Sequence, residues 1–269
     1  MERLKNRSRP PAVAGMFYPA EVKTLKREIH RFLDNASAEF SNSEHRIKAL
    51  IVPHAGYIYS GPIAASAYKQ LIPYQHLIKR VVLLGPCHRV AINGMALPGS
   101  SHFRTPLGEI PIDQPAIATL SGLSQITISD EAHREEHSLE VQLPFLQETL
   151  DDFSLVPIVV GDASMQQVSE VINLLWGDEQ TLIVISTDLS HYHDYYQAKQ
   201  LDRATSDAIE NLRPELIRYE DACGRNGLTG MLTATQQHQL TIQTLDLRNS
   251  GDTAGSKDSV VGYGAYVIH

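Results

Sequence analysis

The sequence contains few cysteines and has no excess of basic residues. Only two of its 269 residues are cysteine, Cys87 and Cys223, so a disulfide framework like that of small secreted proteins is excluded. Each thiol is expected to be free in a reducing compartment, which makes both of them candidates for chemistry. The formal net charge of -8 and the lack of clustered lysine and arginine argue against a nucleic-acid surface, because phosphate neutralisation needs many basic side chains.

Long hydrophobic runs and linker-like segments are also missing. No apolar stretch reaches the roughly 18 residues that cross a bilayer, and the first residues lack the apolar core of a signal peptide. We therefore expect a soluble, cytoplasmic protein that does not contact a membrane. No Gly/Ser-rich, Pro-rich or single-sign segment divides the chain, so residues 1–269 are expected to form a single domain. Neither a Walker-type phosphate loop nor a Gly-x-Ser-x-Gly elbow occurs.

Three apolar runs rich in β-branched residues each break into a turn that carries histidine. The three segments span residues 49–57, 81–88 and 182–193. In an open α/β sheet the carboxyl ends of parallel strands form the crevice in which ligands bind, so three such turns can bring their side chains to one place. The repetition indicates a metal site or an acid–base site.

The wider pattern alternates between strands and helices. Helices are predicted over 20–35, 63–71, 138–150, 164–176, 195–211 and 226–238, and strands over 49–52, 80–84, 155–160, 182–186, 241–247 and 260–268. Pro62 is expected in the first turn of the second helix, where proline is tolerated. Between residues 94 and 111, repeated glycine and proline predict hairpins. The alternation favours an α/β fold with a mixed, largely parallel central sheet flanked by helices.

The first two turns offer metal ligands. Pro53 stiffens the exit from the strand before His54, and Gly56 permits a tight turn, so the imidazole is held on rigid backbone. An isolated histidine at a strand end can also simply cap a loop. His88 repeats the arrangement and follows the thiol of Cys87, and imidazole and thiolate ligands suit iron, copper or zinc far better than magnesium or calcium.

Cys223 lies just before the helix predicted over 226–238. The partial positive charge of a helix N-terminus is expected to lower the pKa of its thiol and to favour the thiolate, which binds metals or attacks electrophiles. The alternative is a small buried side chain with only a packing role.

Asp188, His191 and His193 follow the third apolar run. In an extended loop the two imidazoles point the same way, and one of them can act as a general base, because histidine as a residue type titrates close to physiological pH. Asp188 can orient that imidazole or bind a ligand hydroxyl. The alternative is a polar surface loop.

Glu136 and His137 stand just before Ser138, which is expected to cap the helix over 138–150. Both side chains can line the same site. A charged segment at the start of a helix explains them equally well.

Together these residues resemble the MEMO family, whose bacterial and archaeal members are called AmmeMemoRadiSam system protein B. The resemblance extends over nearly the whole chain. It is carried by AGMFYP (14–19), PHAGYIYSG (53–61), LGPCH (84–88), EHSLE (136–140), STDLSH (186–191), CG (223–224), SGDT (250–253) and VGYGA (261–265), in the family's order. The family is similar in fold to the LigB-type class III extradiol dioxygenases, which hold non-haem iron in an α/β crevice.

The resemblance implies that His54, His88 and Cys223 are metal ligands. It implies that His191 is the acid–base histidine, with Asp188 and His137 nearby. The dioxygenases complete their ligand set with a carboxylate, whereas this family has cysteine. Because a thiolate is softer and donates more electron density, it favours Cu(I), zinc or redox-active iron. We expect iron or copper as the cofactor, with zinc as a further option.

The sequence departs from the family's pattern before His88 and in the loop at residues 255–258, where an acidic residue and an aromatic residue are usual. Cys87 stands where a small polar residue would precede the histidine. It is expected either as an alternative ligand, or as the partner of Cys223 in a disulfide that forms when the site is empty and oxidised.

The function that the resemblance implies is that of a metal-dependent redox enzyme, which uses open coordination positions for dioxygen or an organic substrate. The alternative is a non-catalytic peptide-binding or scaffold protein that uses the same crevice. Eukaryotic relatives are associated with phosphotyrosine peptides, but a net-negative chain without an arginine cluster suits phosphate poorly. The name of the bacterial system further implies an AMMECR1-like protein and a radical SAM enzyme as partners, and a small molecule or peptide as ligand.

Overall fold

The computed structural model describes residues 7–36 and 46–269, and most of its strands form one large mixed sheet. The strands of this sheet are β2 (Ala49–Val52), β3 (Arg80–Pro86), β4 (Met95–Leu97), β7 (Ile126–Ile128), β8 (Ser154–Val160), β9 (Thr181–Ser186), β10 (His191–His193), β11 (Ile242–Asn249) and β12 (Val260–Ile268). Their order is β10-β12-β2-β9-β3-β8-β4-β7, with β11 paired to β12. The expected α/β fold is confirmed.

The centre of the sheet is parallel. Strands β2, β9, β3 and β8 run side by side in the same direction, and β2 and β9 are buried along their whole length. Such strands are buried on both faces, which is why they appear in the sequence as continuous apolar runs. Strand β9 inserts between β2 and β3, although it follows both in sequence. The turns after these three strands therefore lie next to one another at one edge of the sheet.

Antiparallel strands complete the sheet on both sides of this centre. Strand β12 is antiparallel to β2, β10 and β11, and β4 is antiparallel to β8 but parallel to β7. The hairpin predicted between residues 94 and 111 is confirmed for β5 (His102–Thr105) and β6 (Gly108–Pro111). These two strands form a smaller sheet with β1 (Ser8–Arg9).

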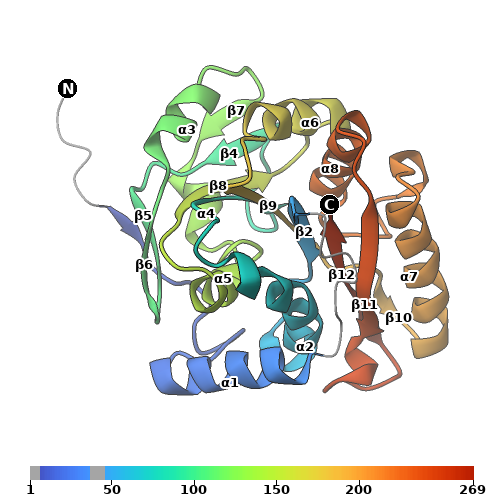
Figure 1. The fold of residues 1–269 in the computed structure, drawn as a ribbon. Helices are drawn as coiled ribbons and strands as arrows, with labels where there is room; N and C mark the ends of the chain where they lie inside the picture. The colour runs from blue at the N-terminus through green and yellow to red at the C-terminus, as the bar shows by residue number, and fades with distance from the viewer. Residues whose placement is uncertain (1–6, 37–45) are drawn as a thin grey trace.

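Helices cover the sheet in separate groups. The helices are α1 (Val22–Asn35), α2 (Tyr57–Tyr68), α3 (Gln114–Leu120), α4 (Asp130–Arg134), α5 (Leu143–Thr149), α6 (Met165–Leu174), α7 (Tyr195–Glu210) and α8 (Arg225–Gln237). Helices α1, α2 and α5 pack together, and α2 contacts β2 and β12. Helix α8 packs on α6, β3 and β9, while α7 lies along β11 and β12 (Figure 1).

The second helix begins earlier than its proline predicts. Helix α2 starts at Tyr57, so Pro62 lies inside the helix and not in its first turn. Proline costs one backbone hydrogen bond within a helix. The early start nevertheless buries the ring of Tyr57, which packs on Phe145, and lets its backbone N–H donate to the carbonyl of Phe17 at 2.7 Å. These tertiary contacts outweigh the cost of the proline.

The helix predicted over 138–150 is also interrupted. A short 3-10 turn, Glu140–Gln142, precedes α5. Ser138 does not cap a helix, because its hydroxyl donates to the carbonyl of Pro86 at 2.8 Å. This bond ties the segment to the end of β3, and so the segment's side chains face the edge of the sheet described above.

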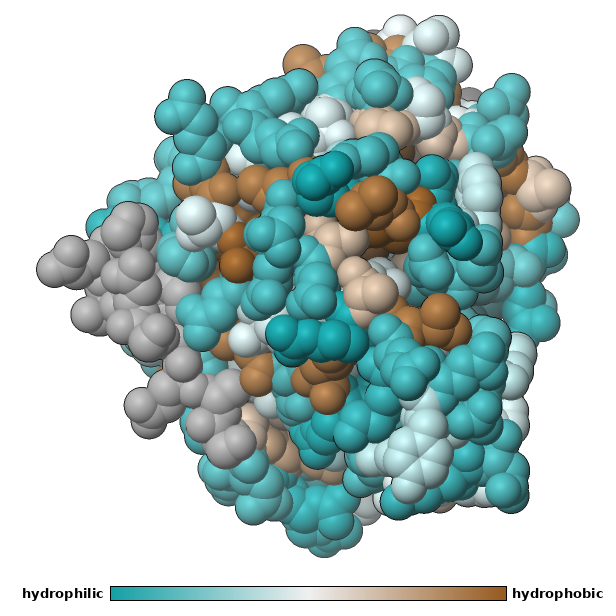
Figure 2. All heavy atoms as spheres, turned by 90° about the vertical axis from the view of Figure 1, so that its right-hand side faces the viewer, coloured by the Kyte–Doolittle hydropathy of each residue, from teal (hydrophilic) through white to brown (hydrophobic). Residues whose placement is uncertain are grey.

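The face that carries α7 and β11 is mainly hydrophilic, with apolar side chains in small separate groups (Figure 2). Among the described residues, no helix combines the length and the apolar character that a membrane span requires.

A buried carboxylate beneath β10 makes the stability of the fold depend on pH. Asp202 of α7 is 2% exposed and accepts the backbone N–H of Ser190 at 3.0 Å. Burial raises the pKa of Asp202 to about 6. Between about pH 4 and 6 the folded state therefore binds more protons than the unfolded chain, and the free energy of unfolding falls as the pH rises through this range.

Asp202→Asn should remove this fall, because the amide keeps an acceptor for Ser190 but does not ionise. One pKa unit corresponds to about 1.4 kcal/mol, so the variant should gain roughly 2–3 kcal/mol over the wild type between pH 4 and pH 7.5. Urea unfolding at the two pH values measures this gain. Asp207→Asn, at an exposed position of the same helix, is the control and should show no such gain. Parallel pH profiles for the wild type and Asp202→Asn would contradict the prediction.

Candidate metal centre

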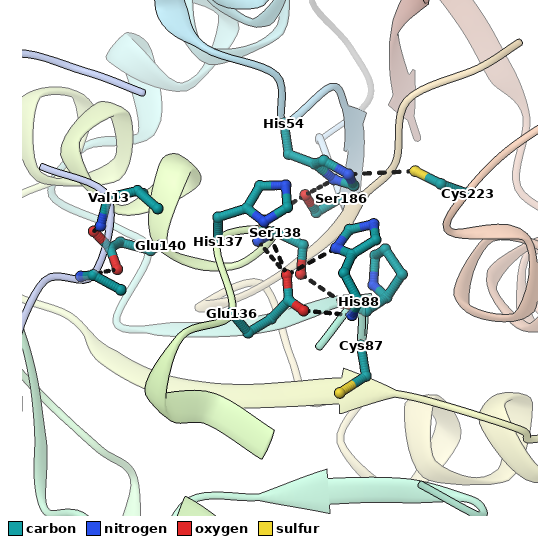
Figure 3. Close-up of polar contacts among 12 residues, drawn as sticks. Val13, His54, Cys87, His88, Glu136, His137, Ser138, Glu140, Ser186 and Cys223 are labelled. Atoms are coloured by element: carbon teal, nitrogen blue, oxygen red, sulfur yellow. Dashed lines mark hydrogen bonds and ion pairs between the residues drawn. The ribbon is translucent and has the colours of Figure 1, made fainter. Parts of the chain in front are cut away.

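Three side chains from distant parts of the chain converge at the edge of the sheet. His54 follows β2, His88 follows β3 and Cys223 precedes α8. One donor atom from each of the three lies within 4.8 Å of the other two, and the Nε2 atom of His54 is 3.3 Å from the Sγ atom of Cys223 (Figure 3). The structure therefore brings together the three residues that the sequence singled out as ligands.

His54 is held on both its backbone and its ring. Its backbone N–H donates to Oδ1 of Asp188 at 2.7 Å, and its Nδ1 atom lies 2.9 Å from the hydroxyl of Ser186. The side chain is 2% exposed. Burial, together with the neighbouring His88, lowers the pKa of His54 to about 3, so the ring is neutral at physiological pH.

His88 is oriented by the carboxylate of Glu136. The Nδ1 atom of His88 is 2.9 Å from Oε1, and the backbone N–H of His88 donates to Oε2 at 2.5 Å. Burial alone would raise the pKa of Glu136, but the hydrogen bonds from His88 and Ser138 overcome that effect and lower it to about 2. An ionised carboxylate can only accept, so the hydrogen of the imidazole lies on Nδ1 and Nε2 keeps its lone pair. Metal-binding histidines commonly have such a carboxylate partner.

The pKa of the Cys223 thiol differs from the value expected from the sequence. The helix N-terminus was expected to lower the pKa of its thiol, whereas burial and the nearby carboxylate of Asp188 raise it to about 12. The dipole effect is weaker than the cost of desolvating a thiolate beside a negative charge. Gly224, the next residue, has no room for a side chain, because a Cβ atom there would lie 2.7 Å from Cβ of Thr187 and 2.8 Å from the carbonyl of Ser186. This close approach is what places Cys223 beside β9.

Asp188 and His137 border the cluster. Oδ2 of Asp188 lies 4.0 Å from Nε2 of His54, and burial raises the pKa of this carboxyl. The ring of His137 lies 5.5 Å from that of His54 and stacks on that of His88 at 4.7 Å, and burial lowers the pKa of His137 to about 4. The ring of His137 faces that of His88, and one donor atom from each of His88, Glu136 and His137 also lies within 4.8 Å of the other two, so these residues form a second group next to the first.

His191 and His193 belong to the short strand β10, and not to a loop as expected. Both side chains line the same cavity as the cluster. Between them, Tyr192 has a φ of 63°, which accompanies a shift in the pairing of β10 with β12. Tyr192 is 78% exposed at the edge of the cavity.

The cluster lies at one wall of a cavity of about 820 Å³. The other lining residues are Phe17, Ala55, Gly56, Tyr59, His137, Asp188, His191, Tyr192, His193, Tyr219, Glu220, Ser250, Gly255, Ser256, Ser259, Val261 and Tyr263. The lining formed by the described residues includes imidazoles, phenols and two carboxylates but no lysine or arginine. The cavity is therefore suited to neutral or cationic polar ligands more than to phosphate.

Cys87 does not join the cluster. Its side chain points away from His54 and Cys223 (Figure 3), and its sulfur lies 3.9 Å from the carbonyl of Ala132. Both cysteines are free. The expectations that Cys87 is an alternative ligand, or a disulfide partner, are not supported by this arrangement.

Sequence reasoning missed several residues that support the cluster. The polar groups behind His54 come from Ser186, Gln142 and Tyr68, and Phe17 packs against His137 with ring centroids 4.6 Å apart. Phe17 and Gln142 lie within or next to segments that carry the family resemblance, but nothing in their local pattern indicates these contacts.

Comparisons with known proteins identify the family. The family model described as Memo-like protein matches residues 9–267. A MEMO1 family protein of Methanosarcina mazei is 36% identical, with 97% of this chain and 98% of the relative covered, and the protein memo-1 homolog of Caenorhabditis elegans is 31% identical, with 97% and 82% covered. The fold is also similar to the crystal structure of an uncharacterised protein from Escherichia coli K12, with a TM-score of 0.50 and 14% identity over 81% of this chain and 99% of that one. The chain belongs to the Memo family.

Proposed function

We propose that the protein binds one iron or copper ion through His54, His88 and Cys223 and uses it as a metal-dependent oxidoreductase. The observation that carries this proposal is the convergence of one donor atom from each residue within 4.8 Å. Three segments far apart in sequence supply these donors.

The donor set suits these metals. Two imidazoles and one thiol are borderline to soft ligands, which favour iron, copper or zinc over magnesium or calcium. On His88, the Glu136 carboxylate leaves the Nε2 lone pair free for a cation. When bound, iron or copper would supply one-electron redox chemistry and open coordination positions for a small ligand.

The side chains around the cluster can serve a ligand in the cavity. His191 faces the cavity, where its imidazole can accept a proton from a bound molecule. The buried carboxyl of Asp188 can accept a hydrogen bond from a ligand hydroxyl, and His137 completes the polar wall. These are the roles we assign to the three residues in acid–base chemistry.

A second function uses the same cavity without turnover. Tyr192 and Tyr219, 78% and 69% exposed, both line the cavity and offer aromatic surface to a peptide. Such a peptide-binding or scaffold role is the rival proposal, whereas an AMMECR1-like protein and a radical SAM enzyme are the partners that we propose for the enzyme. Oxygen uptake with catechols would favour the enzyme, whereas saturable peptide binding without oxygen uptake would favour the rival.

Elemental analysis of protein purified without an affinity tag tests the metal site. The wild type and Cys87→Ser should each carry about one iron, copper or zinc ion per chain, because three strong donors converge at one point. His54→Ala and Cys223→Ser should lose the ion. Cys87→Ser is the matched control, since it removes the thiol that points away from the cluster. Unchanged metal content in both His54→Ala and Cys223→Ser would remove the proposal.

A further inference from the structure

The hydroxyl of Ser186 sits at the end of β9 in a fully buried position with three polar neighbours. Its oxygen is 2.6 Å from the carbonyl of Ser138 and 2.9 Å from Nε2 of Gln142. It is also 2.9 Å from Nδ1 of His54 (Figure 3). A serine hydroxyl has one hydrogen and two lone pairs. With three partners, the hydroxyl therefore donates one of these hydrogen bonds and accepts the other two.

The amide of Gln142 has only one orientation that satisfies its partners. Its Nε2 atom lies 2.8 Å from the carbonyl of Pro53, and its Oε1 atom accepts the hydroxyl of Tyr68 at 2.9 Å. Because a backbone carbonyl can only accept, the NH₂ group must face Pro53. Its second hydrogen then points to Ser186, so Gln142 donates to that hydroxyl.

The hydroxyl of Ser186 donates to the carbonyl of Ser138 and accepts from His54. The carbonyl of Ser138 can only accept, so it takes the single hydrogen of Ser186. With Gln142 occupying one lone pair of the hydroxyl, the other lone pair is left for His54. The Nδ1 atom of His54 must therefore carry a hydrogen and donate it.

We propose that Ser186 and Gln142 are positioning residues that lock His54 in the tautomer with hydrogen on Nδ1, so that the lone pair of Nε2 points toward Cys223. The backbone carbonyls of Pro53 and Ser138 fix the direction of the whole chain of bonds, because neither can donate. Glu136 imposes the same tautomer on His88. Both imidazoles thus present Nε2 lone pairs to the cluster before any cation arrives.

The tautomer can be measured on the metal-free wild-type protein. Long-range ¹H–¹⁵N correlation spectra, with His54 assigned by the loss of its signals in His54→Ala, distinguish a protonated from an unprotonated ring nitrogen. The protonated nitrogen of His54 should be Nδ1. A hydrogen on Nε2 in the wild type would overturn the inference, whether or not the protein binds a metal.

A substitution of Ser186 tests the cause. In Ser186→Ala, His54 loses the acceptor of its Nδ1–H, so the population with hydrogen on Nε2 should rise. Ser100→Ala is the matched control, because Ser100 is also buried and its hydroxyl has no hydrogen-bond partner among the described residues. The same tautomer in Ser186→Ala as in the wild type would contradict the assigned role.

The consequence for metal affinity rests on the proposed function. Chelator competition should show about 10- to 100-fold weaker binding for Ser186→Ala than for Ser100→Ala, the usual effect of losing a hydrogen-bond partner behind a ligand. Equal affinities would show that the hydroxyl does not position the ligand. If the wild type has the Nδ1–H tautomer but binds no metal, the proposed function fails and the tautomer assignment stands.

Discussion

Replacement of Glu140 by alanine should lower the free energy of unfolding by about 3–5 kcal/mol, the cost of breaking a buried ion pair by removing one partner. Glu140 is fully buried and pairs with Arg9. It also accepts the backbone N–H groups of Ala12 and Val13 at 2.7 and 3.0 Å and the hydroxyl of Tyr18 at 2.6 Å. The substitution leaves a buried guanidinium and three donors without this acceptor.

Chemical denaturation measures this loss, with Glu109→Ala as the matched control. Glu109 also forms an ion pair, with Arg104 at 3.2 Å, but both side chains are about half exposed. Exposed pairs contribute about 0–1 kcal/mol, so the control should unfold close to the wild type. Equal midpoints for the two variants would show that the Glu140 network does not hold the N-terminal segment in place.

Glu136→Gln should weaken metal binding by about 10- to 100-fold, because the orienting partner of a metal-binding histidine is altered. The carboxylate accepts from Nδ1 and the backbone N–H of His88 and from the backbone N–H of Ser138 at 2.8 Å. An amide has only one acceptor oxygen, so one of these donors must face an NH₂ group. In either orientation of the amide, the NH₂ group faces the Nδ1–H or the backbone N–H of His88, so one of the two contacts that hold His88 becomes repulsive.

Competition with a coloured chelator measures the affinity, and denaturation of the same samples shows whether the fold is intact. Glu148→Gln is the control, since this carboxylate is also largely buried but pairs with Lys26 and His30 away from the cluster. Glu148→Gln should bind the metal as the wild type does. If Glu136→Gln also retained wild-type affinity, the carboxylate would have no role in orienting His88.

The strands at the parallel centre of the sheet were predictable, because a strand that is buried on both faces must consist of apolar residues throughout. The runs at β2, β3, β8 and β9 are short, apolar and β-branched, and each ends at a turn. Their order was not predictable. The insertion of β9 between β2 and β3 depends on which pairing of distant strands buries the most surface. This cannot be predicted from the local sequence of any one strand.

For the candidate site, too, some residues could be predicted from the sequence and others could not. His54, His88 and Cys223 each stand in a short motif that carries the family resemblance, so sequence alone brought them forward. The roles of Ser186 and Gln142 depend on hydrogen-bond directions across three segments, which appear only in the fold. The prediction of a lowered pKa for the Cys223 thiol was wrong for a related reason. The start of a helix can be predicted from the sequence, whereas the burial of the thiol beside Asp188 cannot.

The wide separation of the three donors along the chain would link the proposed cation binding to folding itself. An unfolded chain holds residues 54, 88 and 223 apart, so a preformed set of donors exists only in the native state. A cation at about one hundred times its dissociation constant would then stabilise that state by about 2.7 kcal/mol. A rise in melting temperature with added metal would therefore reveal occupancy without any knowledge of a substrate.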